Sequence, residues 1–261
     1  MLTPLHERYR PQRLAEVVGQ PGAIAQVRRV LEEGWGGRAW WICGPSGTGK
    51  TTLARLIAAE GAASESIFEI DAGDLGDVRE WATGLWTYGY PPKGGKAWIV
   101  NEAHGLSTRQ VRQLLTFLEP LPSHVAMIFT TTEAGEQLLL DDRLDARPLI
   151  SRCTVIRLVA PLAAFARRAA TIAHREHLNG LAKGAFRHLA TKHDCNLRAM
   201  LAELETGRIT LPSVQQRRQR KPGPGRCGHC GEPIRRGKFC DTTCYFAYLR
   251  AQKHHRKGGV D

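Results

Sequence analysis

Eight consecutive residues carry the clearest chemical pattern in this chain of 261 residues. Residues 44–51 read Gly-Pro-Ser-Gly-Thr-Gly-Lys-Thr and match the phosphate-binding pattern G-x-x-x-x-G-K-[ST]. Glycines permit the tight turn that points backbone N–H groups at phosphate oxygens, while the lysine reaches the terminal phosphates and the last hydroxyl binds Mg²⁺. The predicted phosphate-binding residues are Gly44, Pro45, Ser46, Gly47, Thr48, Gly49, Lys50, Thr51 and Thr52.

A second pattern is an apolar segment that ends in polar side chains, at residues 96–104. Ligands of a parallel α/β sheet lie at the carboxyl ends of its strands, so Asn101 and Glu102 are expected beside the phosphates. Asn101 would face Mg²⁺, and Glu102 would polarise the attacking water. Because Asn101 is neutral where an acid is usual, we expect weak Mg²⁺ binding and slow turnover. The alternative is that Glu102 is a surface carboxylate at a strand end.

Three threonines, residues 130–132, follow a third apolar segment at 125–129. Their hydroxyls would lie at the same crevice, where Thr132 could sense the γ-phosphate or hold a water molecule. Threonine is also a common strand residue, so a purely structural role is the alternative.

These side chains need a sheet and helices to position them. Short apolar runs predict strands at 39–43, 67–71, 125–129 and 154–158 and within 96–104. Helical spacing predicts helices at 22–33, 52–60 and 107–119, one near 78–85, and three between 161 and 207, the last capped by Asn196 or Asp194. We therefore predict an α/β fold with a five-stranded parallel sheet and a small three-helix lid.

The positive charge of the chain is concentrated at one end. Lys and Arg outnumber Asp and Glu by 37 to 25, and residues 208–261 hold 13 of these basic residues but only 3 of the acidic ones. Such a segment usually binds a polyanion, so DNA is the expected partner, with a merely solubilising tail as the alternative. The sequence has no run of 18 apolar residues and no signal-peptide core, so we expect no membrane segment.

Four of the seven cysteines form two short-spaced pairs in this basic tail. Two pairs of thiolates can surround one Zn²⁺ tetrahedrally, and the metal would stabilise a module too small to fold on its own apolar core. We predict a treble-clef-like or knuckle-like zinc finger, with unliganded thiols in a reducing compartment as the alternative. The predicted zinc ligands are Cys227, Cys230, Cys240 and Cys244, and His229 could replace one of them.

The order of these motifs resembles that of AAA+ ATPases, and among them the clamp-loader subunits of the bacterial DNA polymerase III gamma/tau type. Six motifs carry the resemblance across residues 5–207, and the phosphate loop is the Walker A motif among them. The other five are Arg8-Tyr9-Arg10-Pro11 with Val17-Val18-Gly19-Gln20, Asn101-Glu102-Ala103-His104 for the Walker B sequence D-E-A-H, Thr131-Thr132 for sensor 1, Ser151-Arg152-Cys153, and Leu197-Arg198 for sensor 2.

This resemblance implies roles for further residues. Arg198 would contact the γ-phosphate of ATP from the lid, and Arg152 would be an arginine finger that reaches the ATP of a neighbouring subunit. A finger that acts in trans implies a homo-oligomer or hetero-oligomer. The residues that would hold the adenine are Tyr9, Arg10, Pro11, Val18 and Gly19.

Three features depart from this family. Residues 132–152 are longer than usual, and the sequence lacks both the helical collar domain of clamp loaders and the zinc module that bacterial loaders insert between the two Walker motifs. A pentameric ring, and a sliding clamp or polymerase as partner, are therefore open questions.

The sequence predicts four parts: a P-loop ATPase core (1–160), a helical lid (161–210), a basic linker (211–225) and a zinc finger with a basic tail (226–261). The leading hypothesis is an ATP-hydrolysing, clamp-loader-like protein that acts on DNA during replication. We expect it in the cytoplasm at the nucleoid or, for a phage protein, in the host cytoplasm. The alternatives are a non-catalytic, nucleotide-gated DNA-binding scaffold, and a branch-migration or transposition helper ATPase.

Overall fold

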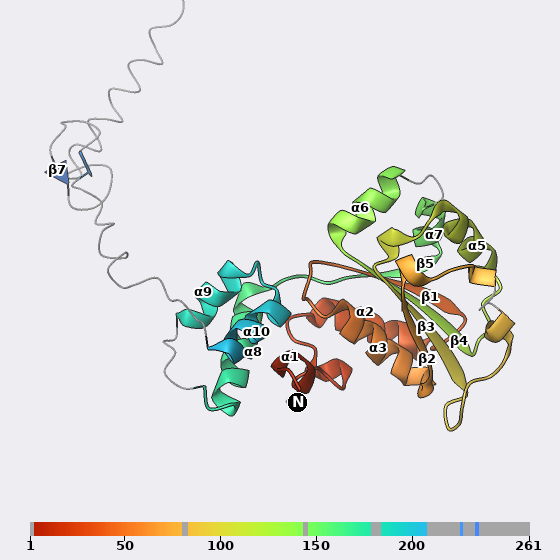
Figure 1. The fold of residues 1–261 in the computed structure, drawn as a ribbon, viewed down its shortest axis with the longest axis horizontal. Coiled ribbons are helices and arrows are strands. Elements are labelled where there is room, and N and C mark those ends of the chain that lie inside the picture. Colours follow the sequence, from red (N-terminus) through yellow and green to blue (C-terminus); the bar gives the residue numbers. More distant parts are fainter. Residues whose placement is uncertain are drawn as a thin grey trace, which may run out of the picture. The chain divides into compact units, whose positions relative to one another are not determined.

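A computed structural model describes residues 3–79, 83–142, 146–178 and 184–207, together with the backbone of 225–226 and 233–234. The chain forms two compact units, Met1–Ile209 and Thr210–Asp261. In the first unit five parallel strands form one sheet in the order β2-β3-β4-β1-β5 (Figure 1), which confirms the predicted fold class. The strands are β1 (Arg38–Cys43), β2 (Ala62–Asp71), β3 (Gly95–Asn101), β4 (Val125–Thr131) and β5 (Cys153–Arg157).

Helices cover both faces of this sheet, as a parallel sheet requires. Side chains alternate between the two faces along β1, so the fully buried Trp40 packs against one helical layer and Trp41 against the other. The layer at Trp40 consists of α2 (Pro21–Glu32) and α3 (Lys50–Gly61), and the layer at Trp41 of α5 (Thr108–Leu118), α6 (Glu133–Asp142) and α7 (Ala146–Ser151).

Three further helices form the lid that the sequence predicted. They are α8 (Leu162–Arg175), α9 (Ala185–Lys192) and α10 (Leu197–Thr206), and Phe165, Leu189 and Leu201 are buried between them. The short helix α1 (Leu5–Arg8) also packs here through Leu5, which is 2% exposed. The N-terminal segment is therefore part of the lid cluster (Figure 1), a contact that no local pattern predicted.

Polar side chains define the ends of two predicted helices. Ser107 and Gln110 form a reciprocal capping box at the start of α5. Asn196, one of the two predicted caps of α10, accepts a hydrogen bond from the Ala199 amide at 3.1 Å.

The structure differs from the sequence prediction in several elements. Strand β2 begins five residues earlier than expected, and β5 begins and ends one residue earlier. Only the two ends of the helix expected near 78–85 lie within the described residues, and the later end is a 3-10 turn, η3 (Thr83–Trp86). The other 3-10 turns are η1 (Leu14–Glu16), η2 (Ala72–Asp74) and η4 (Ala103–Gly105).

The long segment after residue 132 contains α6 and α7, which the sequence analysis did not assign. Helix α6 is held by Glu136, which is 7% exposed. Its carboxylate accepts hydrogen bonds from Trp41 Nε1 at 2.9 Å and from Arg157 Nη1 at 2.7 Å. These partners lie on β1 and β5, so the contacts that fix this helix are distant in the sequence.

None of the helices among the described residues is long and apolar enough to cross a membrane. In the second unit, the described backbone consists of β6 (Gly225–Arg226) and β7 (Pro233–Ile234), which pair antiparallel. These two strands bracket residues 227–232, which contain the first predicted cysteine pair.

Candidate nucleotide-binding site

The phosphate loop connects β1 to the N-terminus of α3. Gly49 precedes the helix with a φ of 99°, a conformation that side chains rarely adopt. Gly47 has a φ of 73°, and a Cβ atom there would lie 2.0 Å from Asn196 Oδ1. Gly49 turns the chain into α3, and Gly47 lets the N-terminus of α10 approach the loop. Free N–H groups at the start of α3 favour a phosphate ligand.

Lys50 is the first residue of α3 and is 8% exposed. Its ammonium group donates hydrogen bonds to the carbonyls of Gly44 and Pro45, both at 3.0 Å. Burial lowers the pKa of Lys50, an effect that the Glu102 carboxylate opposes and the Arg198 guanidinium reinforces. The charges of Glu102, at the end of β3, and of Arg198, in the lid, thus both act on Lys50 of α3.

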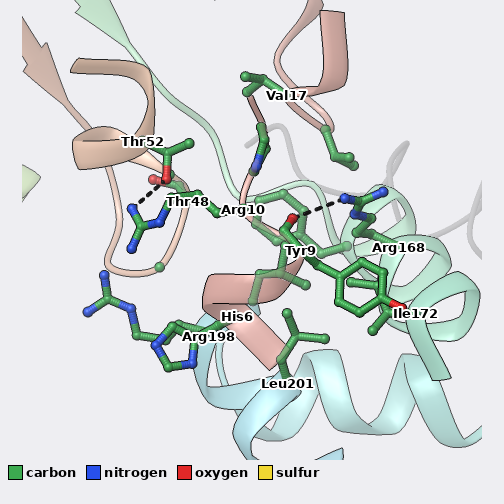
Figure 2. Close-up of a pocket in the computed structure, with 16 residues that line it drawn as sticks. His6, Tyr9, Arg10, Val17, Thr48, Thr52, Arg168, Ile172, Arg198 and Leu201 are labelled. Atoms are coloured by element: carbon green, nitrogen blue, oxygen red, sulfur yellow. Dashed lines mark hydrogen bonds between the residues drawn. The ribbon is translucent and has the colours of Figure 1, made fainter. Parts of the chain in front are cut away.

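A pocket opens between the phosphate loop, the N-terminal segment and the lid (Figure 2). Its apolar lining includes Val18, Phe165, Ile172 and Leu201 beside the ring of Tyr9. An apolar and aromatic lining suits a nucleotide base, and the adjoining loop suits its phosphates. The predicted site residues that line this pocket are Tyr9, Arg10, Pro11, Val18, Gly47, Thr48, Gly49, Thr52 and Arg198.

Polar contacts hold the N-terminal segment between the core and the lid. Arg10 Nη1 donates to Thr52 Oγ1 at 3.1 Å, and Arg168 Nη2 of α8 donates to the Tyr9 carbonyl at 3.2 Å (Figure 2). The Tyr9 hydroxyl donates to Glu176 Oε1 at 2.6 Å, a hydrogen bond that raises the pKa of Tyr9. One short segment thus links α3 to the middle and the C-terminal end of α8.

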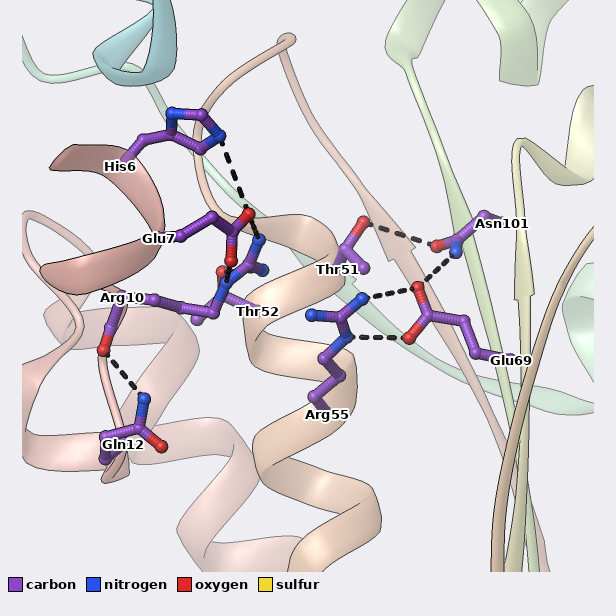
Figure 3. A network of polar contacts seen from close by, with 9 residues as sticks. All are labelled: His6, Glu7, Arg10, Gln12, Thr51, Thr52, Arg55, Glu69 and Asn101. Atoms are coloured by element: carbon purple, nitrogen blue, oxygen red, sulfur yellow. Dashed lines mark hydrogen bonds and ion pairs between the residues drawn. The ribbon is translucent and has the colours of Figure 1, made fainter. Parts of the chain in front are cut away.

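Asn101 belongs to a polar network beside the phosphate loop, part of which is drawn in Figure 3. Its Oδ1 atom accepts hydrogen bonds from Thr51 Oγ1 at 3.3 Å and from Thr130 Oγ1 at 2.9 Å. Its Nδ2 atom donates to Glu69 Oε1 at 2.8 Å, and Arg55 of α3 also binds this carboxylate. Burial raises the pKa of Glu69, but hydrogen bonds from Arg55 and Asn101 outweigh it and leave that pKa below its ordinary value.

Glu102 directly follows β3 in a left-handed backbone conformation, with a φ of 50°. Such a conformation costs a non-glycine residue about 1–3 kcal/mol and is often found at functional sites. The Glu102 carboxylate lies 3.4 Å from His104 Nδ1, which is 3.3 Å from Thr131 Oγ1. The end of β3 is thereby connected to the end of β4, and Glu102 keeps 55% of its side chain exposed.

The three threonines at the end of β4 have different surroundings. Thr130 binds Asn101 and Thr131 lies beside His104. The Thr132 hydroxyl accepts a hydrogen bond from the Gly135 amide at 3.0 Å, within the first turn of α6. Thr132 therefore caps a helix, and Thr130 and Thr131 contact the polar groups next to Glu102.

Arg152 follows α7 and does not line the pocket. Its guanidinium donates to Glu119 Oε1 at 2.6 and 3.1 Å and to the Pro148 carbonyl at 3.1 Å. Its side chain is 37% exposed. This placement separates Arg152 from the phosphate loop of its own chain.

Some site residues were not assigned from the sequence, and Gly19, like Thr132, lies outside the pocket. His6, Val17 and Arg168 line the pocket, and Glu69 binds Asn101. The spacing of Phe165, Arg168 and Ile172 along α8 could have indicated one lid face, but nothing local indicated His6 or Glu69. Predicted Gly19 lies against Pro161 at the start of the lid rather than in the pocket: its added Cβ would be 2.5 Å from Pro161 Cγ.

The four predicted zinc ligands, together with His229, lie outside the described residues. Within the described part of the chain, no group of three or more His, Cys, Asp or Glu side chains is arranged to hold a metal ion. The donors that could take part in a Mg²⁺ site beside bound phosphates are the Thr51 hydroxyl and the Asn101 amide oxygen.

The chain is similar to known proteins in both sequence and fold. Residues 41–158 match the ATPase family associated with various cellular activities (AAA). The DNA polymerase III subunit gamma of Buchnera aphidicola is 29% identical over 178 residues, which are 59% of this chain and 47% of that protein. The DNA polymerase III subunit gamma/tau of Mycobacterium bovis is 31% identical over 161 residues, which are 51% of this chain and 28% of that protein.

The chain thus covers less than half the length of each of these two relatives. Among solved structures, the RuvB Holliday junction branch migration motor of Thermotoga maritima superposes with a TM-score of 0.58 at 18% identity. The match covers 93% of this chain and 72% of that one. At this identity the likeness establishes the fold alone, whereas the polymerase subunits are similar in sequence over about half of this chain.

Proposed function

We propose that this protein binds and hydrolyses ATP to act on DNA in a clamp-loader-like role. The proposal starts from the match of residues 41–158 to the AAA family and from the similarity of the chain to DNA polymerase III gamma and gamma/tau subunits. The observation that supports it most is that the phosphate loop and Arg198 of the lid line one partly apolar pocket, while Asn101, directly before Glu102, is hydrogen-bonded to Thr51 at the end of that loop. A strand-end carboxylate, a buried lysine and a lid arginine are the groups that phosphoryl transfer from a nucleotide requires.

Each group has a role in this proposal. Lys50 and the amides of the phosphate loop bind the phosphates, and Arg198 binds the γ-phosphate from the lid. Glu102 accepts a proton from the attacking water, and Thr131 with His104 holds Glu102 in place. Mg²⁺, bound by Thr51 with Asn101 nearby, would neutralise negative charge on the phosphate oxygens.

Arg152 would complete the site of a neighbouring subunit. It does not line the pocket of its own chain and 37% of its side chain is exposed, which suits a group that acts on another chain. An arginine finger accelerates NTP hydrolysis by about 10³–10⁵-fold where one has been measured. The proposed assembly is therefore an oligomer in which adjacent chains share each nucleotide.

The tail would attach this ATPase to DNA. Its net charge is +10, and we propose that Cys227, Cys230, Cys240 and Cys244 bind one Zn²⁺. The antiparallel pairing of β6 with β7 around residues 227–232 is compatible with a zinc knuckle. Metal analysis of the purified protein tests this: one Zn²⁺ per chain, lost in a Cys227→Ser and Cys230→Ser double variant, is the expected result.

The catalytic role of Glu102 is tested by steady-state ATP hydrolysis with and without primed DNA. Glu102→Gln should reduce turnover by at least about 100-fold while ATP binding persists, because the amide cannot accept the proton. Glu60→Gln, an exposed carboxylate at the end of α3, is the matched control and should hydrolyse ATP like the wild type. Hydrolysis that survives in Glu102→Gln contradicts the assignment.

The neutral Asn101 favours a second candidate, a nucleotide-gated DNA-binding scaffold that does not turn over. ATP binding without hydrolysis, at high Mg²⁺ and with DNA, would select it, as would turnover that appears only after Asn101→Asp. The third candidate is a branch-migration or transposition helper ATPase, for which the RuvB likeness offers a fold but no sequence relationship of comparable strength. Retention or loss of a sliding clamp in a pull-down separates it from the clamp-loader role.

A further inference from the structure

The Asn101 amide poses a chemical problem that an aspartate would not. The two oxygens of a carboxylate are equivalent, so either can face a cation. An amide has one oxygen and one NH₂ group, and rotation by 180° would point the NH₂ group at Mg²⁺. That orientation would repel the cation and remove an acceptor for Thr51. Asn101 can therefore serve a Mg²⁺ site only if another group fixes its orientation.

Glu69 is placed to do this. Its Oε1 atom lies 2.8 Å from Asn101 Nδ2, and a carboxylate accepts hydrogen bonds but cannot donate them. Only the NH₂ group of Asn101 can therefore face Glu69 (Figure 3). The opposite side of the amide, its oxygen, then faces the hydroxyls of Thr51 and Thr130 at 3.3 and 2.9 Å.

The backbone and α3 hold Glu69 in this position. Strand β2 pairs with β3 so that Asp71 is opposite Asn101, and Glu69 lies on the same face two residues earlier. Arg55 binds the Glu69 carboxylate with two hydrogen bonds, from Nε at 2.6 Å and Nη2 at 3.0 Å. A bidentate pair of this kind restricts the rotation of the carboxylate. Arg55 lies one turn after Thr51 on α3, so the whole network is anchored beside the phosphate loop.

We propose that Glu69 is a positioning residue for Mg²⁺, which fixes the Asn101 amide with its oxygen toward Thr51. This inference rests on the proposed function, because it requires a Mg²⁺-nucleotide at the phosphate loop. Outer groups of this kind orient the inner ligands of metal sites, and their loss typically lowers metal affinity about 10–100-fold. Asn101 leaves the end of β3 without a carboxylate, and Glu69 supplies one from the neighbouring strand β2.

The proposal predicts that the effect of Glu69 on Mg²⁺ binding depends on the residue at position 101. In the natural chain, Glu69→Ala frees the amide to rotate and should weaken Mg²⁺ binding. In the Asn101→Asp background, the introduced carboxylate needs no orientation and would face Glu69 across the same short distance. Either oxygen of that carboxylate can face Mg²⁺, so Glu69→Ala should there leave Mg²⁺ binding nearly unchanged.

The experiment measures the affinity for ADP by calorimetry, once with Mg²⁺ and once with EDTA. The dissociation constant in EDTA divided by the dissociation constant with Mg²⁺ reports how strongly Mg²⁺ and nucleotide favour each other's binding. We expect Glu69→Ala to reduce this ratio about 10-fold while the affinity in EDTA stays near that of the wild type. Glu65→Ala removes an exposed carboxylate from the same strand, and this control should leave both values unchanged.

The outcomes distinguish a positioning role of Glu69 from a structural role, and both from the absence of a nucleotide site. Equal loss of affinity with and without Mg²⁺ after Glu69→Ala would indicate a structural role for Glu69 and overturn the proposal. An unchanged ratio, or the same loss of Mg²⁺ coupling in the Asn101→Asp background, would also overturn it. A wild-type protein that binds no ADP in either condition would instead refute the nucleotide site itself, and with it this inference.

Discussion

The two ends of the pocket are assembled from the sequence in different ways. The phosphate end is lined by Gly47, Thr48, Gly49 and Thr52, which belong to one loop and the start of α3. Asn101 lies beside this loop through its contact with Thr51. The apolar end brings together Tyr9, Val18, Phe165 and Leu201, which are nearly two hundred residues apart at the extremes. The comparison suggests that the first end depends on local backbone geometry and the second on how the N-terminal segment and lid pack.

The phosphate end should be the more sensitive to a single substitution. Lys50→Ala removes a buried ammonium group, and we expect affinity for a slowly hydrolysed ATP analogue to fall about 100-fold, as for the loss of a charged hydrogen bond. Lys93→Ala, an exposed lysine distant from the pocket lining, is the control in the same calorimetric titration. A loss below about threefold would mean that the phosphates bind elsewhere.

The apolar end should respond more weakly, because several segments share the binding. Arg168→Ala removes the hydrogen bond from the lid to the Tyr9 carbonyl and should weaken ATP binding about fivefold, the value of one ordinary hydrogen bond. Arg167→Ala is the matched control, since the adjacent Arg167 is exposed and does not line the pocket. If both variants bind ATP equally, the N-terminal segment does not need the lid to hold its position.

Asn196 connects the two ends, since it caps α10 and its Nδ2 atom lies 3.4 Å from Ser46 Oγ in the phosphate loop. Asn196→Ala should lose about 1 kcal/mol of helix capping and lower the melting temperature by about 2–4 °C. Asn196→Asp retains a capping oxygen, so its melting temperature should match that of the wild type. A melting temperature unchanged in both variants would show that this cap does not contribute to stability.

The smallest expected effect lies in the lid alone and depends on pH. Hydrogen bonds from Lys192 outweigh burial and, with His193, keep the pKa of Glu203 below its ordinary value. A depressed pKa stabilises the folded state above the unfolded pKa of about 4.3, and this stabilisation is lost as the pH falls through the folded pKa. The difference in melting temperature between wild type and Glu203→Gln should therefore shrink as pH falls from 7 to about 3. A constant difference would contradict this.

The same contrast explains what the sequence could predict. The sheet, the phosphate loop and the caps at Ser107 and Asn196 follow from short-range patterns of apolar residues, glycines and hydroxyls. Helix α6 and the pocket residue His6 depend on partners far away in the chain, such as Trp41 and Arg157 for Glu136. No pattern of neighbouring residues predicts such contacts.

The residues assigned from the family resemblance have different surroundings in the structure. Arg198 lines the pocket as expected, whereas the Thr132 hydroxyl caps α6 and Gly19 lies at the base of the lid. The three threonines are chemically identical, and only the structure shows that Thr130 and Thr131 contact Asn101 and His104 while Thr132 caps α6. Glu69 escaped prediction because the register of β2 against β3 decides which side chains meet.

The central claim is that Arg152 of one chain completes the ATP site of the neighbouring chain. Mixing Arg152→Ala with Glu102→Gln tests it directly, because the first variant retains Glu102 and the second retains Arg152. Each variant alone should hydrolyse ATP very slowly, and the mixture should recover a substantial part of the wild-type rate, since mixed assemblies contain complete sites. A mixture no more active than its two components, at concentrations where light scattering shows oligomers, would contradict the account.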